Sequence, residues 1–123
     1  MIDLDWIASQ PKPVAIHCPT YHDVMTVLCD VNESRICEPL STEEIIEVTE
    51  IWYNTYGDQT CVRLRYHEDR GGFALHRNTY RFYDESPQYT LVSIDQVKRK
   101  FDLGEIDGDE FCLLSLFGME GDA

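Results

Sequence analysis

The sequence has few basic residues, and its C-terminal end has none. Its 123 residues include 10 lysines and arginines against 23 aspartates and glutamates, which gives a formal net charge of −13 at pH 7. Residues 1–50 carry ten acidic and two basic side chains, residues 51–100 carry six and eight, and residues 101–123 carry seven and none. Such a chain repels nucleic acid and anionic membranes over most of its surface and attracts basic proteins. We therefore expect direct binding neither to nucleic acid nor to membranes.

Long apolar runs and paired cysteines are also missing. No apolar run approaches the roughly 20 residues of a membrane span, and the N-terminal residues lack the basic and apolar regions of a secretory signal. The cysteines are odd in number, widely separated and without a C-x-x-C pair, a spacing typical of reduced, mostly buried thiols in a cytosolic protein. They are Cys18, Cys29, Cys37, Cys61 and Cys112.

The motifs of common enzymes and metal sites are absent too. The chain has no P-loop, dinucleotide fingerprint, nucleophile elbow or H-E-x-x-H sequence. His17 and Cys18 are suitable zinc ligands by type, but adjacent residues of a strand point to opposite faces and do not readily share one ion. A calcium loop that starts at Asp102 fails because Leu113 stands where the bidentate glutamate is needed. We expect no catalytic residue, no metal and no cofactor.

Apolar periodicity and capping residues predict two helices in the first half of the chain. Thr20 precedes a run with the i, i+3, i+4, i+7 spacing of a buried helical face. Ser41 and Glu44 match a capping box before a second such face, although the dense β-branched residues there leave a strand open. We favour a helix that ends near Gly57. The apolar positions are Val24, Val27, Leu28 and Val31 in the first helix and Ile45, Val48 and Trp52 in the second.

The remaining segments predict strands and loops. Residues 14–18 read as a strand, residues 32–40 as a loop, and residues 61–66 and 73–76 as a hairpin around a turn. Residues 80–83 continue the hairpin or form a short turn, residues 89–94 form another strand, and Asp95 starts a short helix that reaches residue 101. We predict one α+β domain over residues 1–123, with a mostly antiparallel sheet packed by one or two helices and an acidic C-terminal segment at 102–123.

One stretch of the chain resembles a known group of proteins. The string VAIHCPT at residues 14–20, the helix after it, Trp52, Tyr56, Cys61 and the strand at 89–94 are similar to small uncharacterised phage and prophage proteins. The likeness covers residues 14–97. Those proteins place a glycine-aromatic-x-tryptophan stretch after the first helix, whereas this chain has NESR at 32–35. The resemblance implies a phage or mobile-element origin and hence the cytosol of a host cell.

Two acidic rows favour a protein-binding function. Glu43, Glu47 and Glu50 are spaced by four and three, which places them on one face of the second helix. The C-terminal segment holds the other row, which consists of Asp102, Glu105, Asp107, Asp109 and Glu110. Carboxylates in such rows imitate the phosphates of a nucleic-acid strand. We predict a non-enzymatic antagonist whose acidic surface occupies a basic, nucleic-acid-binding site on a host defence protein; a merely solvated acidic face is the plainer interpretation.

The mildly basic middle of the chain supports a different function. Arg63 and Arg65 are two apart on a predicted strand and therefore project from one face. Guanidinium groups bind phosphates bidentately and stack on aromatic rings. The alternative prediction is therefore that this face sequesters an anionic nucleotide, and its remaining candidate residues are Arg77, Arg81, Tyr66 and Tyr83. In the plainer interpretation the arginines form salt bridges with the acidic helices, each of which contributes little to stability.

The apolar run at residues 111–117 leaves the oligomeric state open. It fits a last core strand of the domain, and it equally fits an edge strand that pairs with a second copy. Self-pairing would bury apolar surface that a small core does not cover, so a homodimer stays among the predictions.

Overall fold

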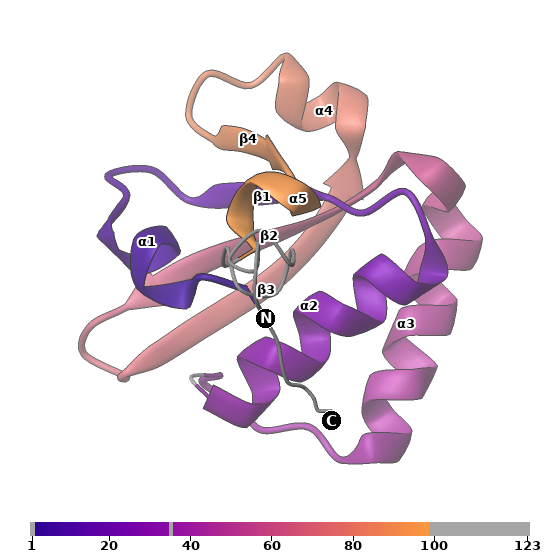
Figure 1. The fold of residues 1–123 in the computed structure, drawn as a ribbon, viewed down its shortest axis with the longest axis horizontal. Coiled ribbons are helices and arrows are strands. Elements are labelled where there is room, and N and C mark those ends of the chain that lie inside the picture. Colours follow the sequence, from indigo (N-terminus) through magenta and orange to yellow (C-terminus); the bar gives the residue numbers. More distant parts are fainter. Residues whose placement is uncertain (1, 35, 99–123) are drawn as a thin grey trace, which may run out of the picture.

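A four-stranded mixed sheet forms the centre of the computed structural model, which describes residues 2–34 and 36–98. The strand order is β3-β2-β1-β4 (Figure 1). β1 pairs antiparallel with β2, β2 pairs antiparallel with β3, and β1 pairs parallel with β4. The strands are β1 Val14–His17, β2 Thr60–His67, β3 Gly72–Thr79 and β4 Thr90–Ser93. The predicted α+β class is confirmed, and the hairpin is β2 with β3.

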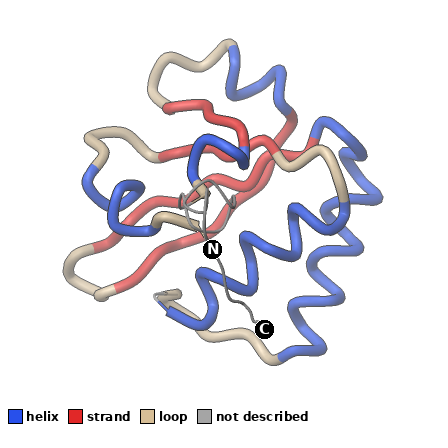
Figure 2. The backbone as a smooth tube through the Cα atoms, viewed as in Figure 1, coloured by secondary structure: helices blue, strands red, loops and turns tan. Residues whose placement is uncertain are grey.

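Two long helices cover one face of this sheet. α2 (Tyr21–Ser34) buries the four apolar residues that the periodicity predicted, and α3 (Thr42–Tyr56) packs beside α2 (Figure 2). Because side chains alternate along a strand, Ile16 of β1 and Val62 of β2 point to this face and are fully buried there. Two short helices, α1 (Leu4–Ser9) and α5 (Ile94–Val97), add Leu4, Ile7, Ile94 and Val97 to the same core.

Side-chain caps fix where the long helices begin. The hydroxyl of Thr20 accepts a hydrogen bond from the main-chain N–H of Asp23 (3.1 Å). The hydroxyl of Ser41 accepts from the N–H of Glu44, whose carboxylate accepts in return from the N–H of Ser41. Gly57 ends α3 with a φ of +58°, which glycine adopts without strain. Residues 42–56 are therefore a helix, and the strand alternative is wrong.

Several local predictions need correction. α1 was not foreseen, and α2 continues to Ser34 into the predicted loop. Residues 80–84 form the short helix α4 (Tyr80–Asp84), because the Thr79 hydroxyl accepts a hydrogen bond from the N–H of Phe82. α5 is capped by Ser93 with Gln96, and this cap lies two residues before the predicted cap at Asp95. The extension of this helix to residue 101, the acidic row from Asp102 and the apolar run at 111–117 lie outside the described residues.

Within the described residues, the opposite face of the sheet is covered only at one end. There α4 and the segment after it bring Tyr83 and Tyr89 against Ala15, Cys61 and Leu91, which together form a small second cluster. Figure 1 shows α4 and β4 at the top of the molecule, away from the two long helices. None of the helices among residues 2–34 and 36–98 has the length and apolar character needed to cross a bilayer. The uncovered part of this face leads to the groove described next.

Candidate ligand-binding groove

A groove of about 750 Å³ opens where β1 ends and β2 continues alone. The β1–β2 pairing runs only as far as Val14 opposite Leu64, whereas β2 stays paired with β3 up to His67. Pro11 and Pro13, whose φ angles are fixed by their rings, directly precede β1. Residues 10–13 do not continue the pairing with β2, and the space beside the last residues of β2 becomes the groove. Its walls are residues 7–8, 10–13, 63–69 and 88–89.

The main chain of Tyr66 faces this groove. In an antiparallel pair every second residue directs both its N–H and its C=O to the same neighbouring strand. The C=O of Thr60 accepts from the N–H of Cys18 (2.8 Å), so Thr60, Val62 and Leu64 face β1 and Tyr66 is the next in that series. Within the described chain no main-chain hydrogen bond joins Tyr66 to residues 10–13. The groove thus offers one backbone donor and one backbone acceptor.

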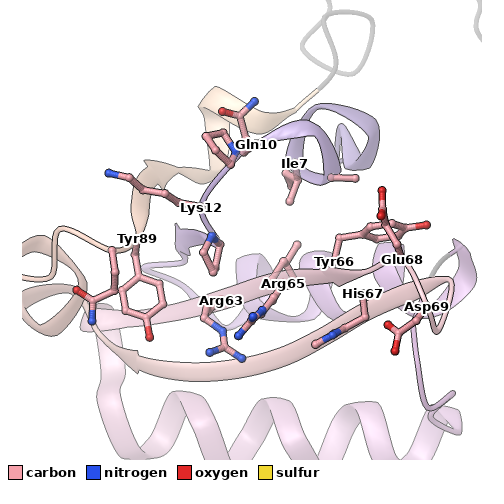
Figure 3. A pocket seen from close by; sticks show the side chains of 15 residues that line it. Ile7, Gln10, Lys12, Arg63, Arg65, Tyr66, His67, Glu68, Asp69 and Tyr89 are labelled. Carbon is pink, nitrogen blue, oxygen red and sulfur yellow. The ribbon is translucent and has the colours of Figure 1, made fainter.

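Arg63 and Arg65 supply the positive charge of the groove. They are two apart on β2, opposite His76 and Ala74 of β3, and project from the face that the long helices leave open. Figure 3 shows their guanidinium groups turned toward each other, beside the ring of Tyr89. The Nε of Arg63 is buried and has no hydrogen-bond partner in the described part of the chain. A buried donor without a partner is costly, which makes this position unusual.

Neither of these two arginines forms an ion pair with another described residue. The cations that do so are Arg70 with Glu38 (3.6 Å), Arg81 with Glu85 (3.1 Å) and Lys98 with Asp95 (3.7 Å). The plainer interpretation, in which the arginines pair with the acidic helices, therefore does not describe Arg63 or Arg65. Two like charges that converge without a counter-ion form a site that attracts an anion.

The other candidate arginines do not join this pair. Arg77 stands opposite Val62 in the register and so projects toward the long helices, and Arg81 is exposed on α4 in its pair with Glu85. Of the candidate tyrosines, Tyr66 lines the groove, whereas Tyr83 lies behind it. Tyr83 is 2% exposed and its hydroxyl has no partner among the described residues. Burial raises the pKa of Tyr83 to about 12, although the nearby Arg63 guanidinium opposes that shift.

Five further groove residues were missed by the sequence analysis. Lys12 stands on the wall opposite β2, where its Nζ donates to the C=O of Pro87 (2.8 Å). Figure 3 shows Tyr89 beside Arg63 and shows His67, Glu68 and Asp69 toward the other end. The sequence Pro-Lys-Pro directly before a predicted strand is the one feature of the sequence that marks this side of the groove. The other residues that line the groove come together through contacts between distant segments, which the sequence pattern does not reveal.

Burial and the neighbouring arginines both act on the pKa of His76. His76 stands opposite Arg63 on β3, and its pKa is lowered by burial first and then by the guanidinium groups of Arg63 and Arg77. A lowered pKa means that a further positive charge is disfavoured at this place.

The acidic row of α3 is exposed as predicted by its spacing. Glu43, Glu47 and Glu50 all lie on the solvent side of the helix. Two large apolar side chains accompany them, because Ile46 is 43% exposed and Ile51 is 54% exposed. Acidic residues in the first turn, such as Glu43, also stabilise the helix through its dipole.

The two buried cysteines are poor nucleophiles. Cys18, Cys29, Cys37 and Cys61 are free thiols, of which Cys18 and Cys61 are buried. Burial raises the pKa of Cys61 to about 12 and raises that of Cys18 as well, so both stay protonated at neutral pH. The imidazole of His17 contacts the C=O of Asp58 (2.8 Å), and no cluster of three potential metal ligands occurs in residues 2–34 and 36–98.

Comparison of the chain with protein-family models, with curated proteins and with solved structures finds no match. The function is therefore argued from the groove and from the surface of α3.

Proposed function

We propose that the protein binds and sequesters an anionic nucleotide in the groove beside β2. The observation that carries this proposal is the arginine pair: Arg63 and Arg65 converge, have no ion-pair partner among the described residues, and include a buried Nε with an unused N–H. A phosphate would supply acceptors for both guanidinium groups and would neutralise their mutual repulsion.

The size and lining of the groove suit such a ligand. A volume of about 750 Å³ falls within the roughly 300–1,000 Å³ of small-molecule sites. Tyr89 offers an aromatic ring beside Arg63. Lys12 stands on the opposite wall, with its Nζ on the C=O of Pro87. Rings and guanidinium planes are the groups on which nucleobases stack.

Sequestration without turnover is supported by the side chains around the groove. Its described lining contains no serine, threonine or cysteine, so none of these three nucleophile types borders the proposed phosphate position. The buried thiols of Cys18 and Cys61 stay protonated, as their raised pKa values require. We therefore propose a binding protein rather than an enzyme.

The test is isothermal titration of the full-length protein with nucleoside diphosphates and with inorganic pyrophosphate, at low salt. The double variant Arg63→Ala with Arg65→Ala should weaken binding at least 100-fold, because each charge-assisted hydrogen bond contributes about 1.5–3 kcal/mol. The matched control is Arg70→Ala with Arg81→Ala, which removes the same charge outside the groove and should leave the affinity unchanged. Failure of every one of these anions to bind the parent protein would exclude the proposal.

A second function has its own supporting observation. The exposed Ile46 and Ile51 lie on α3 beside Glu43, Glu47 and Glu50, so this helix offers apolar contact together with negative charge. A basic surface that normally holds nucleic acid is the complementary partner. We propose as the second candidate that α3 docks on such a host protein, in line with the phage origin that the sequence resemblance implies and with a place in the host cytosol.

This candidate is tested by capture of partners from a bacterial lysate at low salt. Reversal of the α3 row, with Glu43, Glu47 and Glu50 each changed to lysine, should abolish capture of a stoichiometric basic partner without unfolding the domain. The control reverses three exposed acidic residues of other segments, Glu33, Asp58 and Asp84. Equal capture by both variants and the parent would contradict the second candidate.

A further inference from the structure

The outer side of β3 is an open edge of the sheet. β3 stands first in the order β3-β2-β1-β4, so within the described chain it has a strand on one side only. The main chains of Val62 and Leu64 face β1, and therefore their partners across the β2–β3 pair face outward. These partners are Arg77 and Leu75, whose outward N–H and C=O groups have no main-chain partner among the described residues.

One short segment already pairs with the start of this edge. Ile36 forms a parallel bridge with Phe73, and the N–H of Cys37 donates to the C=O of Phe73 (3.0 Å). Phe73 therefore faces outward, as do Leu75 and Arg77, which follow it at intervals of two residues. The pairing of residues 36–37 stops at Phe73, and the rest of the edge is open to a further strand.

An apolar groove of about 330 Å³ lies beside this edge. β3, α3 and the segment between α2 and α3 form its walls. Its two charged residues, Arg70 and Glu38, pair with each other (3.6 Å), so an uncharged, apolar occupant fits it. Several apolar side chains of the groove pack against the core but stay partly exposed, namely Ile36, Leu40, Val48, Trp52 and Leu75. An added strand would bond the edge of β3 and cover these side chains at the same time.

The chain beyond Lys98 contains a segment of matching character. Residues 111–117 have the sequence FCLLSLF, which includes six apolar residues and no charge. Seven residues are within the usual length of a strand. Burial of such a run against the apolar groove would remove its side chains from water, which is favourable.

The described chain ends where this segment can reach the edge of β3. Lys98 forms a bridge with Ile2, and the N–H of Ile2 donates to the carboxylate of Asp30 in α2 (2.8 Å). Ile36, at the apolar groove, follows Asp30 by only six residues. The 13 residues from Lys98 to Phe111 span up to about 43 Å when extended. A helix with its side chains is about 10–12 Å across, so this linker is long enough to pass around α2.

A second copy of the protein fits the edge less well than the chain's own run. A short linker gives a tethered segment an effective concentration of about a millimolar, whereas free copies must meet by diffusion. Two copies also bring together two chains that each have a net charge of −13, and these repel each other.

We propose that residues 111–117 of the same chain pair with the outer edge of β3 as a fifth strand and close the apolar groove. This interaction surface is separate from the groove beside β2, and the inference does not depend on the function proposed for that groove. It assigns the apolar run to the domain's own sheet rather than to a dimer.

The experiment measures amide hydrogen exchange in the full-length protein by NMR. The N–H groups of Leu75 and Arg77 should exchange at least about 100-fold more slowly than in an unstructured chain, because the added strand supplies their acceptors. Nuclear Overhauser contacts between the indole of Trp52 and leucine methyl groups of the run provide a second measurement on the unmodified protein.

The double variant Leu114→Asp with Leu116→Asp places two charges in the run. It should return the amides of Leu75 and Arg77 to rapid exchange. The amides of Ala74 and His76 bond β2, so their continued protection shows that the sheet is intact.

The matched control, Gly118→Asp with Met119→Asp, adds the same charges after the run and should keep Leu75 and Arg77 protected. Rapid exchange of these two amides in the parent protein, or the absence of contacts between Trp52 and the run, would overturn the inference. Protection that survives in the double variant would overturn it as well. Protection that rises with protein concentration, together with a dimer in sedimentation, would assign the edge to a second copy and equally overturn it.

Discussion

The two faces of the central sheet differ in the side chains that they carry and in how far they are covered. The face under α2 and α3 is lined by apolar residues of every strand and is closed, with Val14, Ile16 and Val62 at 0% exposure. The other face carries Arg63 and Arg65, which alternate with Val62 and Leu64 along β2. Among the described residues, α4 and the segment after it cover one end of this face. Alternation along β2 thus separates side chains that stabilise the fold from side chains that remain available for a ligand.

This separation allows one face to change without loss of the other. Substitutions on the closed face leave cavities or strain in a packed core. Substitutions of Arg63 and Arg65 on the open face remove charges that form no ion pair with a described residue. The following variants test that division, in order of decreasing expected effect.

The closed face should be the more sensitive to truncation. Ile16→Ala removes a fully buried side chain from β1 and should lower the free energy of unfolding by about 2–5 kcal/mol. Ile46→Ala, at a site 43% exposed on α3, is the matched control and should change it by less than about 0.5 kcal/mol. Urea denaturation measures both, and similar losses in the two variants would contradict the assigned packing.

The open face should respond to geometry as well as to charge. Arg63→Lys with Arg65→Lys keeps both charges but removes the planar fork that binds a phosphate bidentately. We expect an affinity for nucleotide about tenfold below that of the parent, equivalent to about 1.4 kcal/mol, with unchanged stability to urea. If the lysine variant bound as tightly as the parent, simple charge attraction rather than a defined phosphate contact would explain the binding.

Tyr83 combines features of both faces. Its ring is packed in a buried cluster, whereas its hydroxyl has no hydrogen-bond partner among the described residues. Tyr83→Phe keeps the ring contacts and removes a buried polar group. We expect the free energy of unfolding to stay constant or to rise by up to about 1 kcal/mol. Tyr80→Phe, at an exposed position of α4, serves as the control. A decrease larger than about 1 kcal/mol in Tyr83→Phe would show that the hydroxyl has a partner, such as a buried water.

The smallest effect concerns pH. The pKa of His76 is lowered in the folded state, so the unfolded chain, with a histidine pKa of about 6.5, binds this proton more readily. Above about pH 6.5 the imidazole is neutral in both states and the folded state keeps its full stability. As the pH falls through this value toward the lowered pKa, the unfolded chain takes up the proton first, and the free energy of unfolding decreases. His76→Gln should therefore show a weaker loss of stability between about pH 7 and pH 5.5 than the parent. Identical pH profiles would contradict the lowered pKa of His76.

Local signals were sufficient to predict the long helices and the hairpin. The reciprocal bonds of Ser41 and Glu44 and the turn that ends at Gly71 involve residues close in sequence, so their geometry follows from residue type. The face of Arg77 was not predictable in this way. Its position relative to Arg63 depends on the hairpin register, and a shift of one residue moves a side chain to the opposite face.

The candidate site was predicted only where it lies on one strand. Arg63, Arg65 and Tyr66 are neighbours on β2, and their spacing indicated a shared binding region. Lys12 and Tyr89 come from segments far away in the chain. Lys12 directly precedes β1, and Tyr89 is brought beside it because β4, which begins at Thr90, pairs with β1. The short helix α4 was missed because Phe82 stands where a capping box would have a glutamate or glutamine, so only Thr79 marked its start.

The most direct test of the central claim is a side-chain NMR titration that follows the Nε–H resonances of the arginines in the full-length protein as a nucleoside diphosphate is added. The account predicts large shifts for Arg63 and Arg65, with Arg63 the larger because its buried Nε–H gains an acceptor, and little change for Arg70 and Arg81, which already have carboxylate partners. Shifts confined to Arg70 or Arg81, or the absence of any shift at Arg63 and Arg65 at saturating nucleotide, would contradict it.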